Sequence, residues 1–337
     1  MVSAMLASVL LVPSVSAHDP LASGNNESLA TATLVPDPTK SWAIYAELHE
    51  GGEAQYYRFD ISAGQRIHVM LLKPTSSGFS DFKPGFVLMG PGIANSSVVP
   101  GFVNVSAGSG AAVFNGSQPA QANYEPFSPS AFYQVAEVSI EAPADGTYYV
   151  AVFEANRGGH YGLAIGDRES FTLADWLLMP FSLLRIYEWE GQNLAIVLSP
   201  LAATVAVGMG LLYWRQRKGV RVHPPALVAS LAGFFFIGGG LTVFSQMAFA
   251  LTQAPVDGTV GVTLIFVAIP LILGVGVLRL AFRHGSVWTL KQRIYLAALG
   301  IIALSLWTGY LVGPVLAFMA AAMPTKTSAP VERETQA

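Results

Sequence analysis

The stretch VAEVSIEAPADGTYYVAVF, residues 135–153, decides the fold of the first half of the chain. Its β-branched and aromatic residues favour strands on either side of the turn residues 143–146. Shorter runs of the same kind lie at residues 57–61, 66–72 and 86–89. Short strands separated by Gly, Pro, Asn, Asp and Ser predict an all-β sandwich over residues 18–168. Within it, the Gly- and Ser-rich residues 93–130 are expected to form a long exposed loop.

Composition indicates a membrane protein. The 337 residues are 52% hydrophobic and only 12% charged, which is too apolar for an ordinary soluble protein. Cysteine is absent, so disulfides and thiolate metal sites are excluded. Residues 18–193 carry 18 acidic and 8 basic residues. This acidic balance argues against nucleic acid as a partner, because phosphate binding needs a basic surface.

The first 17 residues predict a signal peptide. They contain an apolar run that is too short to anchor a membrane protein, and they end in the small residues Ser16 and Ala17. We expect cleavage after Ala17, which would make His18 the first residue of the mature chain.

Several strand and turn signals recur together as a family pattern. Residues 52–60 read GEAQYYRFD, residues 63–65 AGQ, residues 142–150 APADGTYYV and residues 161–165 YGLAI. Over residues 50–166 they resemble the bacterial and archaeal pre-peptidase C-terminal domain. This resemblance implies a small jelly-roll-like sandwich with an accessory or binding role. The family's calcium ligands are not matched residue by residue, so calcium binding is left open. The whole layout is also similar to uncharacterised archaeal multi-pass membrane proteins.

Residues 169–193 predict an amphipathic helix at the membrane surface. Thr172 and Asp175 have the spacing of a capping box at its start. Trp176, Tyr187 and Trp189 are the aromatic types found among lipid headgroups. A helix packed on the sandwich is the alternative.

Four uncharged segments predict a four-helix transmembrane domain over residues 194–323. They span residues 194–214, 226–251, 260–278 and 294–319. The connection after the first segment carries Arg215, Arg217, Lys218 and Arg221, and the one after the third carries Arg279, Arg283, Lys291 and Arg293. By the positive-inside rule both connections are cytoplasmic. The β domain and the tail at residues 324–337 are therefore expected outside the plasma membrane, with the tail disordered.

Two kinds of modification or ligand site are suggested outside the membrane. N-glycosylation sequons occur at Asn26, Asn95, Asn104 and Asn115. An N-terminal His18 would chelate copper through its amine and ring nitrogen. Further copper ligands would come from His49, His68, Met70 and His160.

Motif searches favour binding over catalysis. The chain has no G-x-S-x-G, H-E-x-x-H or P-loop sequence. We therefore expect a membrane-anchored accessory protein of the cell envelope without catalytic activity of its own, whose partners are the lipid bilayer and another membrane or envelope protein. Alternatives are a copper-binding protein that uses His18, and a subunit of a membrane transport complex.

Overall fold

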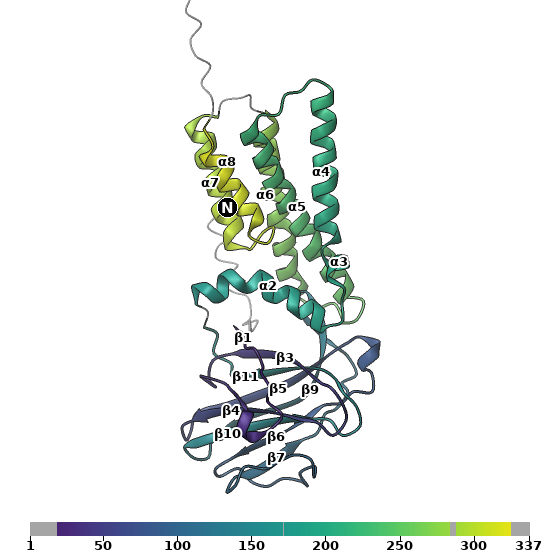
Figure 1. Ribbon diagram of the computed structural model, residues 1–337, viewed down its shortest axis with the longest axis vertical. Coiled ribbons are helices and arrows are strands. Elements are labelled where there is room, and N and C mark those ends of the chain that lie inside the picture. Colours follow the sequence, from purple (N-terminus) through teal and green to yellow (C-terminus); the bar gives the residue numbers. More distant parts are fainter. Residues whose placement is uncertain (1–18, 171, 284–287, 325–337) are drawn as a thin grey trace, which may run out of the picture. The chain divides into compact units, whose positions relative to one another are not determined.

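The computed structural model describes residues 19–170, 172–283 and 288–324. The described residues fall into two compact units, one within residues 1–193 and 248–260 and the other within residues 194–247 and 261–337. Figure 1 labels their elements. The expected signal peptide, His18 and residues 325–337 of the expected tail lie outside the described residues.

Two β-sheets form most of the first unit. The first has the order β1-β3-β11-β5-β9-β8 and the second β2-β4-β10-β6-β7. Strands of the first sheet are β1 (Asp19–Pro20), β3 (Trp42–Leu48), β11 (Gly159–Ile165), β5 (Arg66–Pro74), β9 (Ser130–Glu141) and β8 (Asn123–Glu125). Those of the second are β2 (Thr33–Leu34), β4 (Ala54–Ile61), β10 (Gly146–Phe153), β6 (Gly85–Gly90) and β7 (Gly110–Phe114). Two 3-10 turns lie at Leu29–Thr31 and Ser77–Phe79.

Alternating apolar residues join the two sheets in one core. Ile44 and Leu163 of the first sheet and Phe59 and Val150 of the second belong to the same buried cluster. Burial of each such side chain contributes about 1.5–3 kcal/mol. Because the chain has no cysteine, this apolar core stabilises the domain without disulfides. The prediction of two sheets before a helical region is confirmed.

The turn after β9 carries the chain from one sheet to the other, because β9 and β10 belong to different sheets. Gly146 begins β10 with a φ of 150°. The Tyr148 hydroxyl lies 2.9 Å from the carbonyl oxygen of Ala144 and 2.8 Å from that of Pro91, so either can accept its proton. These contacts fix the turn against the second sheet.

The predicted loop at residues 93–130 differs from the structure, because it contains β7 and β8. Strand β7 pairs with β6 along one side. On its other side the Ala111 amide donates to Asn95 Oδ1 at 2.8 Å and the Val113 amide to Ser96 Oγ at 3.3 Å. Polar side chains therefore accept hydrogen bonds from backbone amides on the outer edge of β7. The Gly- and Ser-rich composition of this segment had predicted a loop instead.

Helix α2 (Leu173–Trp189) confirms the predicted capping box. The Thr172 amide donates to Asp175 Oδ2 at 2.9 Å and the Asp175 amide to Thr172 Oγ1 at 3.2 Å. The helix continues through Pro180, and no second helix begins there.

The second unit is helical. Its elements are α3 (Leu194–Val197), α4 (Ser199–Arg217), α5 (Pro224–Ala250), α6 (Val260–Arg283), α7 (Leu290–Ser305) and α8 (Val312–Ala322). Helices α4, α5 and α6 lie side by side, and glycine makes the close approach possible. A Cβ at Gly208 of α4 would lie 2.5 Å from the Phe234 ring of α5, and one at Gly274 of α6 would lie 2.5 Å from Ile237. By length and composition, α5 and α6 can each cross a membrane.

Two of the four predicted spans are interrupted. The first is divided at Leu198 into α3 and α4. The fourth, residues 294–319, is not one helix but the pair α7 and α8. Between them Trp307, Gly309 and Leu311 have φ of 49°, 68° and 66°, a left-handed backbone that ends a right-handed helix. A continuous apolar sequence concealed this break.

Candidate functional site

The C-terminal end of α2 packs on the outer face of the first sheet. Trp189 is 8% exposed, and its Nε1 donates to the Tyr161 carbonyl oxygen at 3.0 Å. The Tyr45 ring meets the indole edge-on at 5.0 Å, and His160 Nδ1 lies 2.5 Å from the Trp189 carbonyl oxygen. Tyr187 is also buried. Trp189 thus differs from its predicted headgroup position, because the sheet offers its N–H a partner and its ring an apolar contact.

The N-terminal half of α2 exposes large apolar side chains. Leu173 is 74% exposed, Leu178 57%, Phe181 49% and Leu177 37%. Trp176, which the sequence assigns to the headgroup region, lies partly exposed in the same half. We call Leu173, Leu177, Leu178 and Phe181 the α2 apolar row. Exposed apolar side chains grouped in this way are typical of a surface that meets another molecule or an apolar phase.

The end of α4 combines exposed aromatic and basic side chains. The Lys218 ammonium lies 4.1 Å from the Trp214 ring centroid, and the Arg217 guanidinium lies 5.5 Å from that of Tyr213. Arg221 is exposed, and Arg215 lies over the ring of Phe282 at 4.8 Å. Stacked aromatic and basic groups are typical of a membrane–water boundary.

The described histidines of the predicted copper set do not converge. Each faces a different carboxylate: His49 and Glu53 at 3.2 Å, His68 and Glu137 at 3.0 Å, and His160 and Glu47 at 3.5 Å. Met70 is partly exposed, two positions along β5 from His68. Within residues 19–170, 172–283 and 288–324 no group of three His, Asp or Glu side chains could hold a metal. Copper binding through His18 stays a prediction, because His18 lies outside these ranges.

A chain of buried polar groups, which the sequence did not reveal, leads from the core to an open cleft. The Tyr57 and Tyr161 hydroxyls meet at 2.5 Å, and the Tyr161 hydroxyl donates to Gln55 Oε1 at 2.6 Å. Gln55 Nε2 then donates to Glu53 Oε1 at 2.6 Å. Although burial opposes it, the bonds from Gln55 and His49 hold the pKa of Glu53 below its ordinary value. The cleft measures ≈ 410 Å³ and is lined by Glu27, His49, Glu50, Glu53, Tyr56 and Phe102.

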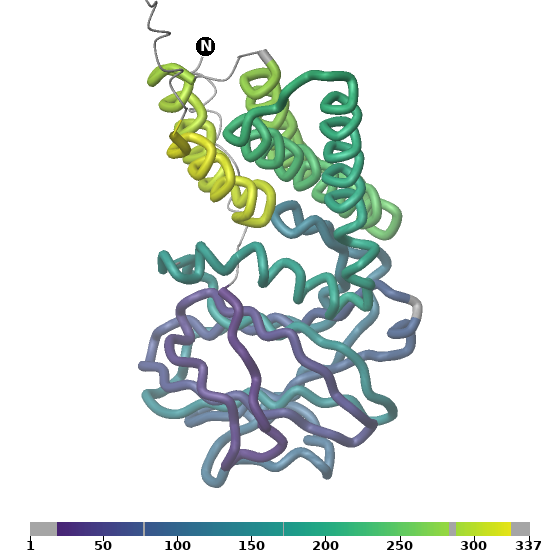
Figure 2. Tube along the Cα trace, turned by 45° about the horizontal axis from the view of Figure 1, so that its top comes forward, coloured from purple at the N-terminus to yellow at the C-terminus, as the bar shows by residue number. Residues whose placement is uncertain are grey.

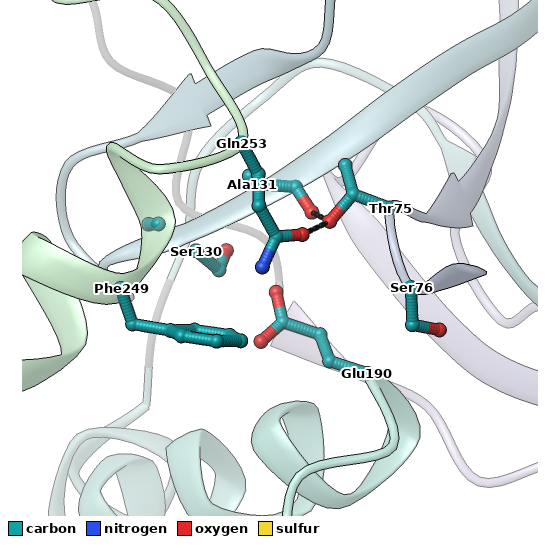
Figure 3. Close-up of a pocket in the computed structure, with 8 residues that line it drawn as sticks. Thr75, Ser76, Ser130, Ala131, Glu190, Phe249 and Gln253 are labelled. Carbon is teal, nitrogen blue, oxygen red and sulfur yellow. Dashed lines mark hydrogen bonds between the residues drawn. The ribbon is translucent and has the colours of Figure 1, made fainter.

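A smaller cavity of ≈ 20 Å³ lies beside Glu190, just beyond α2 (Figure 3). Residues 248–260 belong to the same unit and contribute Gln253, whose Oε1 accepts a hydrogen bond from the Thr75 hydroxyl. Loss of water raises the pKa of Glu190 to about 8, although hydrogen bonds from Gln192 and Ser130 oppose the shift. The space is sufficient for one water molecule. Because its pKa lies above 7, the Glu190 carboxyl group is mostly protonated at neutral pH.

Accessibility divides the four sequons. Asn26 is 2% exposed and its carbonyl oxygen accepts from the Tyr56 amide at 2.7 Å. Asn95, Asn104 and Asn115 are exposed. Burial of Asn26 disfavours a glycan at this position in the folded domain. The other positions stay predictions.

Comparisons with known proteins concern the β domain. No family model and no curated protein matches the chain. The crystal structure of the pre-peptidase C-terminal domain of collagenase from Bacillus anthracis is 20% identical, with 97% of that chain and 42% of this one covered at a TM-score of 0.23. The β domain resembles a pre-peptidase C-terminal domain. The predicted resemblance is thus confirmed. At this identity and TM-score nothing about ligand, activity or partner follows from it.

Proposed function

We propose that this chain is a membrane-anchored binding or accessory protein of the cell envelope. Its β domain lies outside the plasma membrane and is held at the bilayer surface by the N-terminal half of α2. The α2 apolar row carries this proposal, since complete burial of a large apolar side chain contributes about 1.5–3 kcal/mol and insertion would recover the part of it that each exposed side chain of the row still lacks. The capped start of α2 and its docked end keep the row pointing in a fixed direction relative to the sheet.

The helical unit supplies the anchor. Helices α5 and α6 have the length and apolarity of membrane spans, and α4, about 28 Å long at 1.5 Å per residue, is nearly as long as the hydrocarbon core is thick. Basic side chains follow α4 and α6, whereas the connection between α5 and α6 carries Asp257 and no base. This asymmetry favours α4, α5 and α6 as spans, with the β domain outside and both basic connections in the cytoplasm.

The role assigned to the β domain is binding rather than catalysis. Its motifs resemble an accessory domain, and its acidic composition argues against a nucleic-acid partner. A membrane or envelope protein is the partner class that such an anchored domain can reach.

Membrane anchoring through the α2 apolar row can be tested in proteoliposomes. Because the chain has no cysteine, a single introduced cysteine is the only site that a thiol-reactive label can modify. Leu178→Cys is labelled with an environment-sensitive fluorophore, and Ser62→Cys, at an exposed turn of the β domain, is the matched control. We expect blue-shifted emission and quenching by spin-labelled lipid at position 178 but not at 62. Equal, water-like emission at both positions would refute contact between the row and the bilayer.

The accessory role is tested separately in intact cells. Intact cells are treated with a short-span amine-reactive crosslinker, the membranes are solubilised, and the mass of the crosslinked species is measured. We expect a discrete complex that is heavier than one copy of the chain. A native species that remains a lone monomer counts against an accessory role while leaving the anchoring result intact.

A further inference from the structure

Helices α7 and α8 form an antiparallel hairpin. Figures 1 and 2 show the chain turning back on itself between them, so that the start of α7 and the end of α8 lie at the same end of the helical unit. A Cβ at Gly300 of α7 would lie 2.9 Å from the Phe318 ring of α8, so the two helices pack closely against each other there. This end of the unit also carries the end of α6.

Neither helix of the pair is long enough to cross a bilayer. The 16 residues of α7 extend about 24 Å and the 11 residues of α8 about 17 Å, at 1.5 Å per residue. The hydrocarbon core is about 30 Å thick. A hairpin of this length would enter a membrane from one face without reaching the other.

The turn of the hairpin is built for burial inside protein. Irregular backbone at membrane depth is tolerated only where protein or a water-filled cavity surrounds it. Here the Thr308 amide donates to the Ala303 carbonyl oxygen at 2.9 Å and the Gly313 amide to that of Gly309 at 3.2 Å. A Cβ at Gly239 of α5 would lie 2.8 Å from the Gly309 nitrogen. Because Gly239 has no side chain, the turn between α7 and α8 can pack directly against the backbone of α5.

We infer that α7 and α8 form a re-entrant hairpin, so that the C-terminus emerges on the cytoplasmic face, on the side opposite the β domain. This inference rests on the proposed membrane topology and reverses the predicted extracytoplasmic tail. Lys291 and Arg293 stand at the start of α7, and the positive-inside rule places that end in the cytoplasm. Because α8 returns to the same end, the residues after Ala322 leave the membrane there as well.

Single-cysteine labelling tests the inference in the full chain, which has no cysteine of its own. A membrane-impermeant maleimide is applied to intact and to permeabilised cells that carry Val98→Cys, Lys218→Cys, Ser328→Cys or Glu332→Cys. Val98 of the β domain is 92% exposed, and Lys218 lies exposed after α4. We expect Val98→Cys to react in intact cells, and both tail variants to match Lys218→Cys by reacting only after permeabilisation.

Reaction of either tail variant in intact cells, at the level of Val98→Cys, would overturn the hairpin and restore a fourth span. Failure of both tail variants to react even in permeabilised cells would also overturn it. The two control variants test the proposed membrane topology independently of the hairpin. That topology would be wrong if Lys218→Cys reacted in intact cells or if Val98→Cys reacted only after permeabilisation. In that case a tail that still follows Lys218→Cys supports the hairpin alone.

Discussion

Replacement of Tyr161 by Phe should destabilise the β domain more than replacement of its hydrogen-bonded partner Tyr57. Gln55 Nε2 donates to Glu53 Oε1 at 2.6 Å and to the Glu47 carbonyl oxygen at 2.7 Å, which turns Oε1 towards Tyr161. Since the Tyr161 proton goes to Gln55, Tyr57 must donate to the Tyr161 oxygen. The Tyr161 hydroxyl is therefore hydrogen-bonded to two buried partners.

The magnitudes follow from the groups left without a partner. Tyr161→Phe leaves the Tyr57 hydroxyl proton and Gln55 Oε1 without a hydrogen-bond partner, and each such buried group costs about 1–3 kcal/mol, or about 2–6 kcal/mol together. Tyr57→Phe leaves the bond from Tyr161 to Gln55 intact and should cost about 1 kcal/mol. Tyr149→Phe is the control, because its hydroxyl makes no hydrogen bond to the described part of the chain and its ring is partly buried in the same domain.

Pulse proteolysis of the full-length protein in detergent, over a urea series, measures the free energy of unfolding of the β domain. The expected order of cost is Tyr161→Phe, then Tyr57→Phe, then the control near zero. A Tyr57→Phe variant that loses as much stability as Tyr161→Phe would refute the assigned direction of the hydrogen bonds.

Other consequences are open to measurement. Trp189→Ala removes a buried indole and should destabilise the docked end of α2 by about 3–5 kcal/mol, seen as faster hydrogen exchange at residues 182–189; unchanged exchange would contradict the docking. Burial raises the pKa of Glu125 to about 7 and of Glu190 to about 8, so both contribute stability that is fully present below their unfolded pKa values near 4.5 and is lost as pH rises to about 8. Glu190→Gln should flatten this decline in urea unfolding between pH 5 and 8, and an unaltered slope would argue against it. Gly309→Val places a β-branched residue at a φ of 68°, where strain of about 1–3 kcal/mol should lower the melting temperature in detergent, whereas Gly261→Val, in open space, should change it less.

Local signals in the sequence were sufficient for much of the fold. The alternation in residues 135–153 predicts β9 and β10, and the Thr172 and Asp175 pair predicts the start of α2. Both depend on neighbours along the chain. Whether β9 and β10 pair with each other depends instead on contacts distant in sequence, and here the turn crosses between the sheets.

The features that the sequence did not predict depend on which parts of the folded chain surround a residue. Trp189 is equally suited to lipid headgroups and to a sheet, and only the placement of the Tyr161 carbonyl decides between them. Hydropathy treats residues 294–319 as continuous because every residue is uncharged. Gly309, Gly313 and Pro314 were the available signal for a break, since glycine admits a left-handed turn and proline suits the first turn of a new helix.

The outer edge of β7, closed by Asn95 and Ser96, affects how copies of the chain can crowd together. The other outermost strands, β1, β2 and β8, are only two or three residues long. Unpaired strand edges are where β proteins polymerise, and short or closed edges prevent it. Copies of the chain that lie close together on one membrane would therefore find no open edge at β7 on which to pair a strand of a neighbour.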